Sequence, residues 1–342
     1  MKAFVKTGSQ PGEAGVENVT VARPGPNEVL LRVASCGICG SDVHAFRSDS
    51  GFEWIRPPIT LGHEFSGTVE EIGHNVTRVS PGDRVVPIAV QGCGRCAFCR
   101  AGSTQLCPNR VAVGLSRDGG MAEYAVMPEQ QLVPVPEELD LTVASVTEPL
   151  SVALHAVDVR AHIEPGQAVV VSGPGPIGVF CAMLAQIRGA EVLLTGVGQD
   201  SESRLPAAER AGLRTANLSE HSLEEHLERS FGDDALDVWI ESSGSVQALS
   251  SALESVRAGG TVVVVGLYAQ EMTFSPTAAV RRELTLLFSY SCNYADYEAT
   301  MDLLASSAVD PSPLLSTYPL TDAPEAFEAV SGGRTVKAIL VP

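Results

Sequence analysis

A glycine-rich hexapeptide near the middle of the chain limits the folds open to this sequence more than any other feature. Gly173-Pro-Gly-Pro-Ile-Gly178 follows the short apolar run 167–172 and precedes the helical pattern 179–189. Glycines at these spacings permit a tight turn between a strand and a helix, and they let a pyrophosphate approach the backbone at the helix N-terminus. Because a strand precedes the hexapeptide and a helix follows it, a dinucleotide-binding turn is favoured over an ordinary Gly-Pro turn.

Six further segments of the second half alternate between strand-like and helix-like patterns. The expected strands cover 191–195, 236–241 and 261–267, and the expected helices cover 203–211, 222–231 and 246–257. Strands that alternate with helices predict a doubly wound parallel sheet. We therefore expect an α/β fold with a Rossmann-type dinucleotide-binding domain over 151–289.

The flanking segments differ in composition. Glycine, proline and short valine-rich runs punctuate residues 1–150, which is typical of a small β-rich domain. The segment 290–342 adds an amphipathic helix near 294–306 and a last strand pattern, TVKAILVP. This strand is expected to return to the first domain or to lie at the edge of the parallel sheet. The amphipathic run 141–160 is expected to bridge the two domains.

Four of the eight cysteines lie within fifteen residues, at Cys93, Cys96, Cys99 and Cys107. The first three can point at one centre from a glycine-rich loop, and the fourth closes that loop from the far side. Four thiolates around one ion form the closed tetrahedral arrangement of structural zinc. Disulfides, idle thiols and an iron–sulfur cluster are the alternatives, but nothing else in the chain indicates electron transfer. We predict a structural zinc site.

A second group of potential ligands lies upstream of these cysteines. Cys39, His63 and Glu64 supply sulfur, nitrogen and oxygen from separate loops. Three protein ligands leave a fourth position for water or substrate, which is the arrangement of a catalytic zinc. A redox pair of Cys36 and Cys39 is the alternative, but it leaves the His-Glu pair unexplained and no thioredoxin-like pattern surrounds it.

Composition excludes several classes of partner. The formal net charge is −18, which repels nucleic acid and anionic membranes. No apolar run approaches the length of a membrane span, and the N-terminal MKAFVKTG lacks the apolar region of a signal peptide. We therefore expect a cytoplasmic protein with reduced thiols, no nucleic-acid partner and no membrane partner.

These motifs together give the chain its resemblance to a known family. GICGSDVH, LGHEFSG, the four-cysteine segment, EPLSVALHA and GPGPIG resemble those of the zinc-dependent medium-chain dehydrogenases, in the branch of the sorbitol, butanediol and threonine dehydrogenases. The resemblance covers the whole chain. It implies a GroES-like catalytic domain over 1–150 and 290–342 beside the Rossmann-type domain, two zinc ions per chain and a homo-oligomer, either tetramer or dimer.

The resemblance also assigns roles to individual residues. It implies that Cys39 is the catalytic cysteine, and that Ser41 and His44 form the proton path. It places Glu148 at the catalytic zinc, where this carboxylate exchanges with water or hydrogen-bonds to it. Asp42 is expected either to orient a zinc ligand or to cap the following helix.

The implied reaction is the oxidation of a small-molecule secondary alcohol to a ketone by hydride transfer to NAD(P). Ser289 takes the place of an arginine of the sorbitol dehydrogenases, and Val90 takes the place of a histidine of the threonine dehydrogenases. The remaining substrates are a polyol, sugar, cyclitol, vicinal diol or amino alcohol. The alternatives are a butanediol- or threonine-type dehydrogenase and a non-enzymatic, zinc-stabilised nucleotide sensor.

The second expected strand ends without the acidic residue that usually binds the ribose hydroxyls of NAD. Gly196 stands there, which leaves room for a 2′-phosphate, whereas the following Asp200 and Glu202 repel phosphate and Arg204 suits either cofactor. NAD is slightly favoured over NADP. The residues expected to bind the cofactor are Gly173, Gly175, Pro176, Ile177, Gly178, Gly196, Arg204, Gly266 and Leu267.

Overall fold

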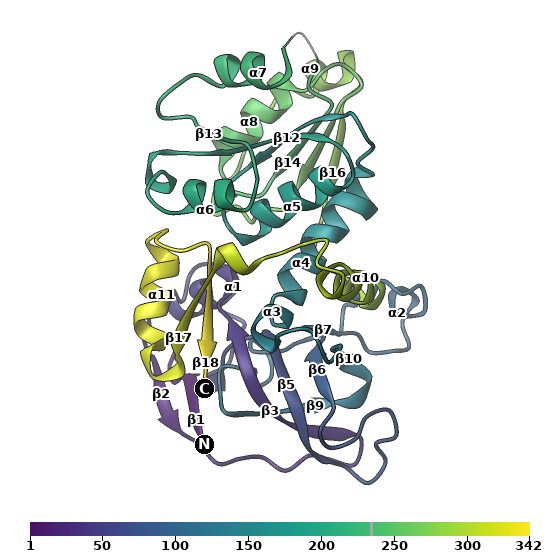
Figure 1. The fold of residues 1–342 in the computed structure, drawn as a ribbon, viewed down its shortest axis with the longest axis vertical. Coiled ribbons are helices and arrows are strands. Elements are labelled where there is room, and N and C mark those ends of the chain that lie inside the picture. The colour runs from purple at the N-terminus through teal and green to yellow at the C-terminus, as the bar shows by residue number, and fades with distance from the viewer. Residues whose placement is uncertain (233–234) are drawn as a thin grey trace. The chain divides into compact units, whose positions relative to one another are not determined.

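The computed structural model describes residues 1–232 and 235–342 (Figure 1). The chain divides into two compact units. The first unit contains Met1–Ser151 together with Cys292–Pro342, and the second contains Val152–Ser291.

The first unit is built mainly from antiparallel strands. Its largest sheet has seven strands, in the order β10-β6-β5-β3-β18-β17, with β9 also paired to β3. A second sheet has the order β2-β1-β4, and β7 pairs with β8. The strands are β1 (Lys2–Lys6), β2 (Ala14–Asn18), β3 (Glu28–Gly37), β4 (Ile59–Thr60), β5 (Glu64–Ile72), β6 (Arg84–Pro87), β7 (Val90–Gln91), β8 (Val111–Ala112), β9 (Tyr124–Pro128), β10 (Leu132–Pro134), β17 (Leu315–Pro319) and β18 (Lys337–Val341).

Short helices complete the first unit. They are α1 (Gly40–Arg47), α2 (Ala97–Arg100), α3 (Leu141–Ala144), α10 (Tyr294–Ala305) and α11 (Ala323–Ser331). The closing strand β18 pairs antiparallel with β3 and parallel with β17. Of the two expected positions for this strand, the structure therefore places it in the first unit, between segments that are some 300 residues apart in the sequence.

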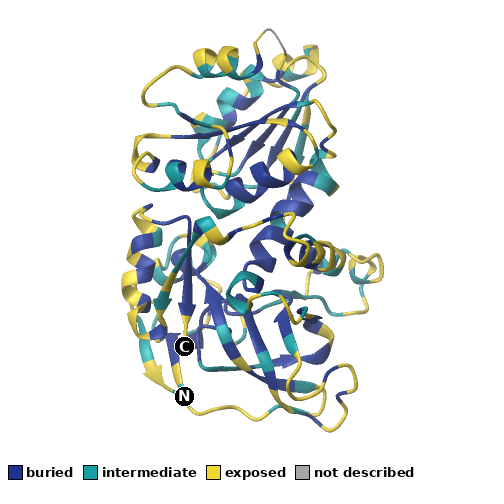
Figure 2. Ribbon diagram, in the orientation of Figure 1, coloured by how far each residue is buried: buried dark blue, intermediate teal, exposed yellow. Residues whose placement is uncertain are grey.

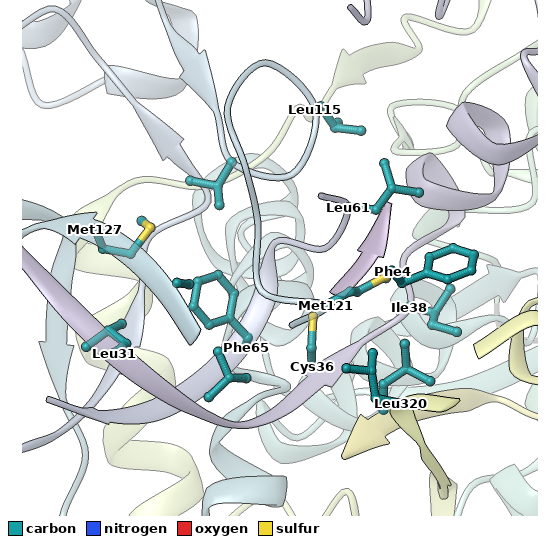
Figure 3. Close-up of a cluster of buried hydrophobic side chains, with 14 of the residues drawn as sticks. Phe4, Leu31, Cys36, Ile38, Leu61, Phe65, Leu115, Met121, Met127 and Leu320 are labelled. Carbon is teal, nitrogen blue, oxygen red and sulfur yellow. The ribbon is translucent and has the colours of Figure 1, made fainter. Parts of the chain in front are cut away.

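Apolar side chains from both segments of the first unit form one core. Phe4, Leu31, Phe65 and Met121 are fully buried there, and Leu320 joins them from the C-terminal segment (Figure 3). The same view places the sulfur of Cys36 among these side chains. Burial, aided by Asp42 and Glu64, raises the pKa of the Cys36 thiol well above its ordinary value, so this cysteine behaves as a core residue.

The second unit is a six-stranded parallel sheet with the order β13-β12-β11-β14-β15-β16. Figure 2 shows that its strands are largely buried, as expected for a sheet covered on both faces. The elements are β11 (Ala168–Ser172), α5 (Pro176–Ile187), β12 (Glu191–Gly196), α6 (Arg204–Arg210), β13 (Thr215–Asn217), α7 (Leu223–Phe231), β14 (Val238–Glu241), α8 (Val246–Ser255), β15 (Thr261–Val264), α9 (Pro276–Arg281) and β16 (Thr285–Phe288).

The strand order reverses at the first strand of this sheet. From β11 the chain moves outward to β12 and β13 and then returns to place β14 on the other side of β11. Ligands of such sheets bind beyond the carboxyl ends of the strands at this reversal. The expected α/β class, with a Rossmann-type parallel sheet, is confirmed.

The run 141–160 differs from a single amphipathic helix. It contains α3, then α4 (Thr147–Leu154), then a π-helix over His155–Ala161. Asp140 caps α3 by accepting hydrogen bonds from the amides of Thr142 and Val143. None of the described helices is long and apolar enough to cross a membrane.

Candidate active site

The three predicted ligands of a catalytic metal converge in the first unit. Cys39 is the N-cap of α1, Glu64 is the first residue of β5, and His63 immediately precedes it. Gly62 makes the turn into β5 with φ +95°, and a Cβ at that position would lie 2.6 Å from the sulfur of Cys36. The turn therefore requires glycine, which explains the Gly-His-Glu order in the sequence.

The ligand atoms of Cys39, His63 and Glu64 all lie within 4.8 Å of one another. His63 and Glu64 are buried, and the Nδ1 atom of His63 has no hydrogen bond, although Asp42 Oδ1 lies 3.5 Å away. Burial alone lowers the pKa of His63, but the nearby Asp42 and Cys39 outweigh it and hold that pKa well above its ordinary value. A thiol, an imidazole and a carboxylate in a pocket that attracts positive charge fit a zinc ion.

Asp42 caps α1 and also faces one of the predicted zinc ligands. Its Oδ2 atom accepts a hydrogen bond from the amide of Cys39 at 2.9 Å, which caps α1. Its Oδ1 atom faces His63 and accepts from the amide of Gly62 at 3.3 Å. A fully buried carboxylate in this position fixes two ligand-bearing loops together.

Lys337 is a site residue that sequence reasoning missed. From β18 its ammonium group donates to Glu64 Oε2 and to the carbonyl of Ile38, the latter at 3.0 Å, and its side chain is fully buried. Burial by itself lowers the pKa of Lys337. Glu64 and Cys39 raise it by more than burial lowers it, so the pKa is above its ordinary value. The only sign of this role in the sequence is a lysine inside an apolar strand pattern, because a lysine is seldom buried unless it is paired.

Glu148 lies in the first turn of α4 and is buried. Burial raises the pKa of its carboxyl to about 7; Glu64 and Asp42 raise it as well, whereas His63 and Lys337 lower it. Glu148 is therefore electrostatically coupled to the ligand cluster. It is not one of the residues whose ligand atoms converge there in the described structure.

The two residues of the predicted proton path lie on α1. The Oγ atom of Ser41 is 3.4 Å from His63 Nε2. His44 is half-exposed, its Nδ1 atom lies 2.7 Å from Asp49 Oδ2, and its ring stacks on Phe52 with 5.1 Å between centroids. The partnership with Asp49 was not anticipated from the sequence.

The four cysteines of the predicted structural site also converge. Their sulfur atoms lie within 4.8 Å of one another, and none of them forms a disulfide. Amide groups point at the thiols: Cys99 N lies 3.4 Å from Cys96 Sγ, and Asn109 N lies 3.4 Å from Cys107 Sγ. Backbone hydrogen bonds lower the pKa of Cys93 to about 6. Converging thiols with amide donors fit a tetrahedral zinc that holds this loop.

Replacing Cys96 by serine is expected to lower the melting temperature by about 5–10 °C, because zinc binding at such a site is coupled to folding. Differential scanning calorimetry together with metal analysis checks this result. Catalysis at a temperature well below melting should be retained within a few-fold. A single zinc per chain, with these four thiols oxidised to disulfides in the native protein, would contradict the assignment.

A cavity of about 480 Å³ opens at the carboxyl ends of the strands in the second unit. Four of the predicted cofactor residues line it, namely Gly173, Gly175, Gly196 and Arg204. Pro176, Ile177 and Gly178 form the first turn of α5 directly behind them. A Cβ at Gly178 would lie 1.9 Å from the carbonyl oxygen of Gly173, so only glycine allows this turn. Gly266 and Leu267 follow β15 and do not line the cavity itself.

Family models match both halves of the chain. Residues 25–137 match the alcohol dehydrogenase GroES-like domain, and residues 176–306 match the zinc-binding dehydrogenase domain. Among the relatives, a sorbitol dehydrogenase from Halalkalibacterium halodurans is 34% identical over 100% of this chain and 99% of its own length. An L-threonine 3-dehydrogenase from Saccharopolyspora erythraea is 35% identical, over 99% and 98% of the two chains.

The chain belongs to the zinc-binding dehydrogenases. A crystal structure described as a zinc-binding dehydrogenase from Sinorhizobium meliloti 1021, bound to NADP, is 34% identical and superposes with a TM-score of 0.91, covering 100% of this chain and 99% of that one. The expected GroES-like and Rossmann-type organisation and the resemblance to the polyol and threonine branch are thereby confirmed. This dehydrogenase is an NAD(P)-dependent alcohol dehydrogenase.

Proposed function

We propose that this dehydrogenase oxidises a secondary alcohol with a neighbouring oxygen or nitrogen, using one catalytic and one structural zinc per chain. The observation that carries the proposal is the convergence of Cys39, His63 and Glu64 within 4.8 Å. Three converging ligands in the described structure leave room for a substrate oxygen, whereas the four-cysteine group provides a closed set.

The residues around the ligand cluster suit proton removal. A bound zinc supplies Lewis acidity that lowers the pKa of the alcohol hydroxyl. Ser41, 3.4 Å from His63 Nε2, is placed beside the ligands to accept the hydroxyl proton. Asp49 accepts from His44 Nδ1, which leaves His44 Nε2 to take up that proton and pass it to solvent.

The substrate class follows from two departures and two relatives. The relatives include a sorbitol dehydrogenase and an L-threonine 3-dehydrogenase. By the family resemblance, Ser289 takes the place of an arginine of the sorbitol branch, and Val90 takes the place of a histidine of the threonine branch. We therefore propose a polyol, sugar, cyclitol, vicinal diol or amino alcohol other than sorbitol or threonine.

The choice between NAD and NADP depends on the end of β12. The sequence slightly favours NAD because Asp200 would repel a 2′-phosphate. Asp200 is, however, buried, accepts from the amide of Val197 at 3.0 Å and pairs with Arg204 at 3.5 Å. This pairing weakens the repulsion, and Gly196 presents no carboxylate to the ribose. We propose that NADP is accepted as well as NAD.

The outer edge of the parallel sheet supports a homo-oligomer, a dimer or a tetramer. Among the described strands β16 pairs with β15 alone. Val280 and Phe288, before and at the end of β16, are 74% and 64% exposed. An open strand edge with exposed apolar side chains is suited to pairing with a second copy. None of the eight cysteines forms a disulfide in the structure, which agrees with a reducing compartment such as the cytoplasm.

The experiment that tests the function is a substrate panel. Polyols, cyclitols, diols and amino alcohols are each supplied with NAD and with NADP, and reduced nicotinamide is followed by its absorbance. We expect alcohol-dependent reduction that is lost when the catalytic zinc is removed. Cofactor binding without reduction by any alcohol would favour the non-enzymatic nucleotide sensor.

Replacing Glu148 by glutamine is expected to leave two zinc ions per chain and to change the rate of oxidation. A third carboxylate or thiolate permanently on the ion, beside Cys39 and Glu64, would make the centre a poor Lewis acid. We therefore expect Glu148 to contact the zinc transiently or through water. Metal analysis with steady-state kinetics checks this. Complete loss of the catalytic zinc from a folded Glu148→Ala protein would overturn it.

The Glu148→Gln substitution should also change how the stability of the metal-free protein depends on pH. The folded-state pKa of Glu148, about 7, lies above its ordinary value of 4.5, so the folded protein holds the proton more tightly. The contribution of Glu148 to the stability of the folded protein therefore falls as the pH rises from 4.5 to about 7. We expect Glu148→Gln to remove that part of the pH dependence in urea unfolding.

A further inference from the structure

The last residue of β14 carries a fully buried carboxylate that the mechanism above does not use. Glu241 lies beside β11, where the strand order of the second unit reverses. This is the position at which ligands bind to such sheets. A buried carboxylate is costly unless several donors surround it, so its partners indicate what it stabilises.

Among the described residues, the partners of the Glu241 carboxylate lie at the ends of three strands or in the loops that follow them. It accepts from the amides of Ser243 at 2.7 Å and Gly244 at 3.2 Å, and from the hydroxyl of Ser243. The hydroxyl of Ser172, at the end of β11, lies 3.4 Å away. The phenol of Tyr268, after β15, also donates to it.

The backbone of Glu241 holds the third loop as well. Its carbonyl accepts from the amides of Val265 at 2.8 Å and Gly266 at 3.0 Å. Burial, together with Glu241, raises the pKa of Tyr268 above its ordinary value, so the phenol remains a donor at neutral pH. One residue thus connects the loops 172–175, 242–245 and 265–268.

These loops are packed too closely to adjust independently. A Cβ at Gly173 would lie 2.8 Å from the side chain of Ser243, and a Cβ at Gly266 would lie 2.4 Å from the amide of Gly244. Two partners of the carboxylate, Ser172 and Ser243, line the 480 Å³ cavity. The loop of Tyr268 carries Gly266 and Leu267, which the sequence assigns to cofactor binding.

We propose that Glu241 and Tyr268 are positioning residues that set the affinity of this enzyme for its dinucleotide. Their hydrogen bond anchors the loop 265–268 to the ends of β11 and β14 before the cofactor arrives. Binding then requires less ordering of the loops, which increases affinity without any contact between these two side chains and the cofactor. The proposal relies on the dinucleotide occupying the cavity of the second unit.

The test measures dinucleotide binding separately from stability. Tyr268→Phe removes a single hydroxyl, and Glu241→Gln keeps the shape of the side chain but removes its charge. Dissociation constants and release rates for NADH and NADPH are measured by nicotinamide fluorescence, and melting temperatures are measured without cofactor. Tyr318→Phe, in the first unit, and Glu254→Gln, on the exposed side of α8, make the same chemical changes elsewhere.

We expect Glu241→Gln, which removes the charge, to weaken binding of the preferred cofactor about tenfold. Tyr268→Phe should weaken it about three- to fivefold, because it loses one hydrogen bond to a charged group. Release should become faster by similar factors, and both controls should stay within twofold of the wild type. Hydrogen exchange of the peptide covering 265–270 should increase in Tyr268→Phe before cofactor is added.

Three possible results decide whether Glu241 and Tyr268 set the affinity for the dinucleotide. A folded Tyr268→Phe protein that binds and releases cofactor like the wild type overturns the proposal, even if it melts earlier, because its role would then be stability alone. If Glu241→Gln fails to fold, Tyr268→Phe decides by itself. A wild-type enzyme that binds neither NADH nor NADPH would instead refute the cofactor site on which this inference relies.

Discussion

Replacing Cys39 by serine is expected to lower alcohol oxidation by at least about 10³-fold, because a serine hydroxyl is a poor zinc ligand and several kcal/mol of Lewis-acid stabilisation are lost. The cofactor cavity is formed entirely by residues of the second unit, so cofactor affinity should be unchanged. Metal analysis should show one zinc per chain instead of two. Steady-state kinetics, metal analysis and cofactor titration together check this result.

Cys36 provides a matched control three residues away. It is fully buried in the apolar core and does not belong to either group of converging ligands in the described structure. Cys36→Ser should lower stability but retain both zinc ions and most of the activity. A Cys39→Ser protein that remains folded, loses zinc and also loses cofactor binding would show that the two functions are not separable as we propose.

Replacing Lys337 by methionine is expected to cost about 3–5 kcal/mol of unfolding free energy in the metal-free protein, because Glu64 would be left as an unpaired buried charge. The loss should be smaller with zinc bound, since the metal compensates the same carboxylate. Methionine keeps the length of the side chain, so packing against Gly37 is largely retained. Urea unfolding with and without zinc measures both values.

The control for Lys337 is an ion pair at the surface. Arg32 and Glu70 lie 3.4 Å apart, with side chains 61% and 48% exposed. Arg32→Met should cost less than about 1 kcal/mol, with no dependence on zinc. If Lys337→Met were equally mild in the metal-free protein, Glu64 would not depend on Lys337 for its charge balance.

Local patterns predicted the parts of this enzyme that depend on local geometry. The turn at Gly173–Gly178 requires glycine for steric reasons, and the four cysteines of the structural group lie within one loop. The spacing of these residues in the sequence was therefore enough to predict the turn and the convergence of the cysteines. Strand boundaries were less accurate: the strand expected over 261–267 ends at Val264, where the backbone turns toward Glu241.

Contacts between distant segments could not be read in the same way. Lys337 reaches Glu64 across 273 positions, and this pairing depends on the register of β18 against β3, which apolar alternation does not specify. Glu241 likewise depends on Tyr268, which lies in the loop after the next strand. Each is a side-chain contact made by tertiary packing.

The pairing of β18 with β3 also determines when the catalytic unit can be finished during synthesis. At about 5–20 residues per second, β18 leaves the ribosome about 15–60 s after β3. Throughout that interval β3 pairs with β5 and β9, but its last residues, Cys36 and Gly37, still lack their partners on β18, and Glu64 lacks its lysine. The second unit, contiguous in sequence, can fold meanwhile. The nascent enzyme therefore acquires its nucleotide fold before its metal site is complete, and zinc captured early by Cys39 and Glu64 would balance the charge of Glu64 until Lys337 emerges.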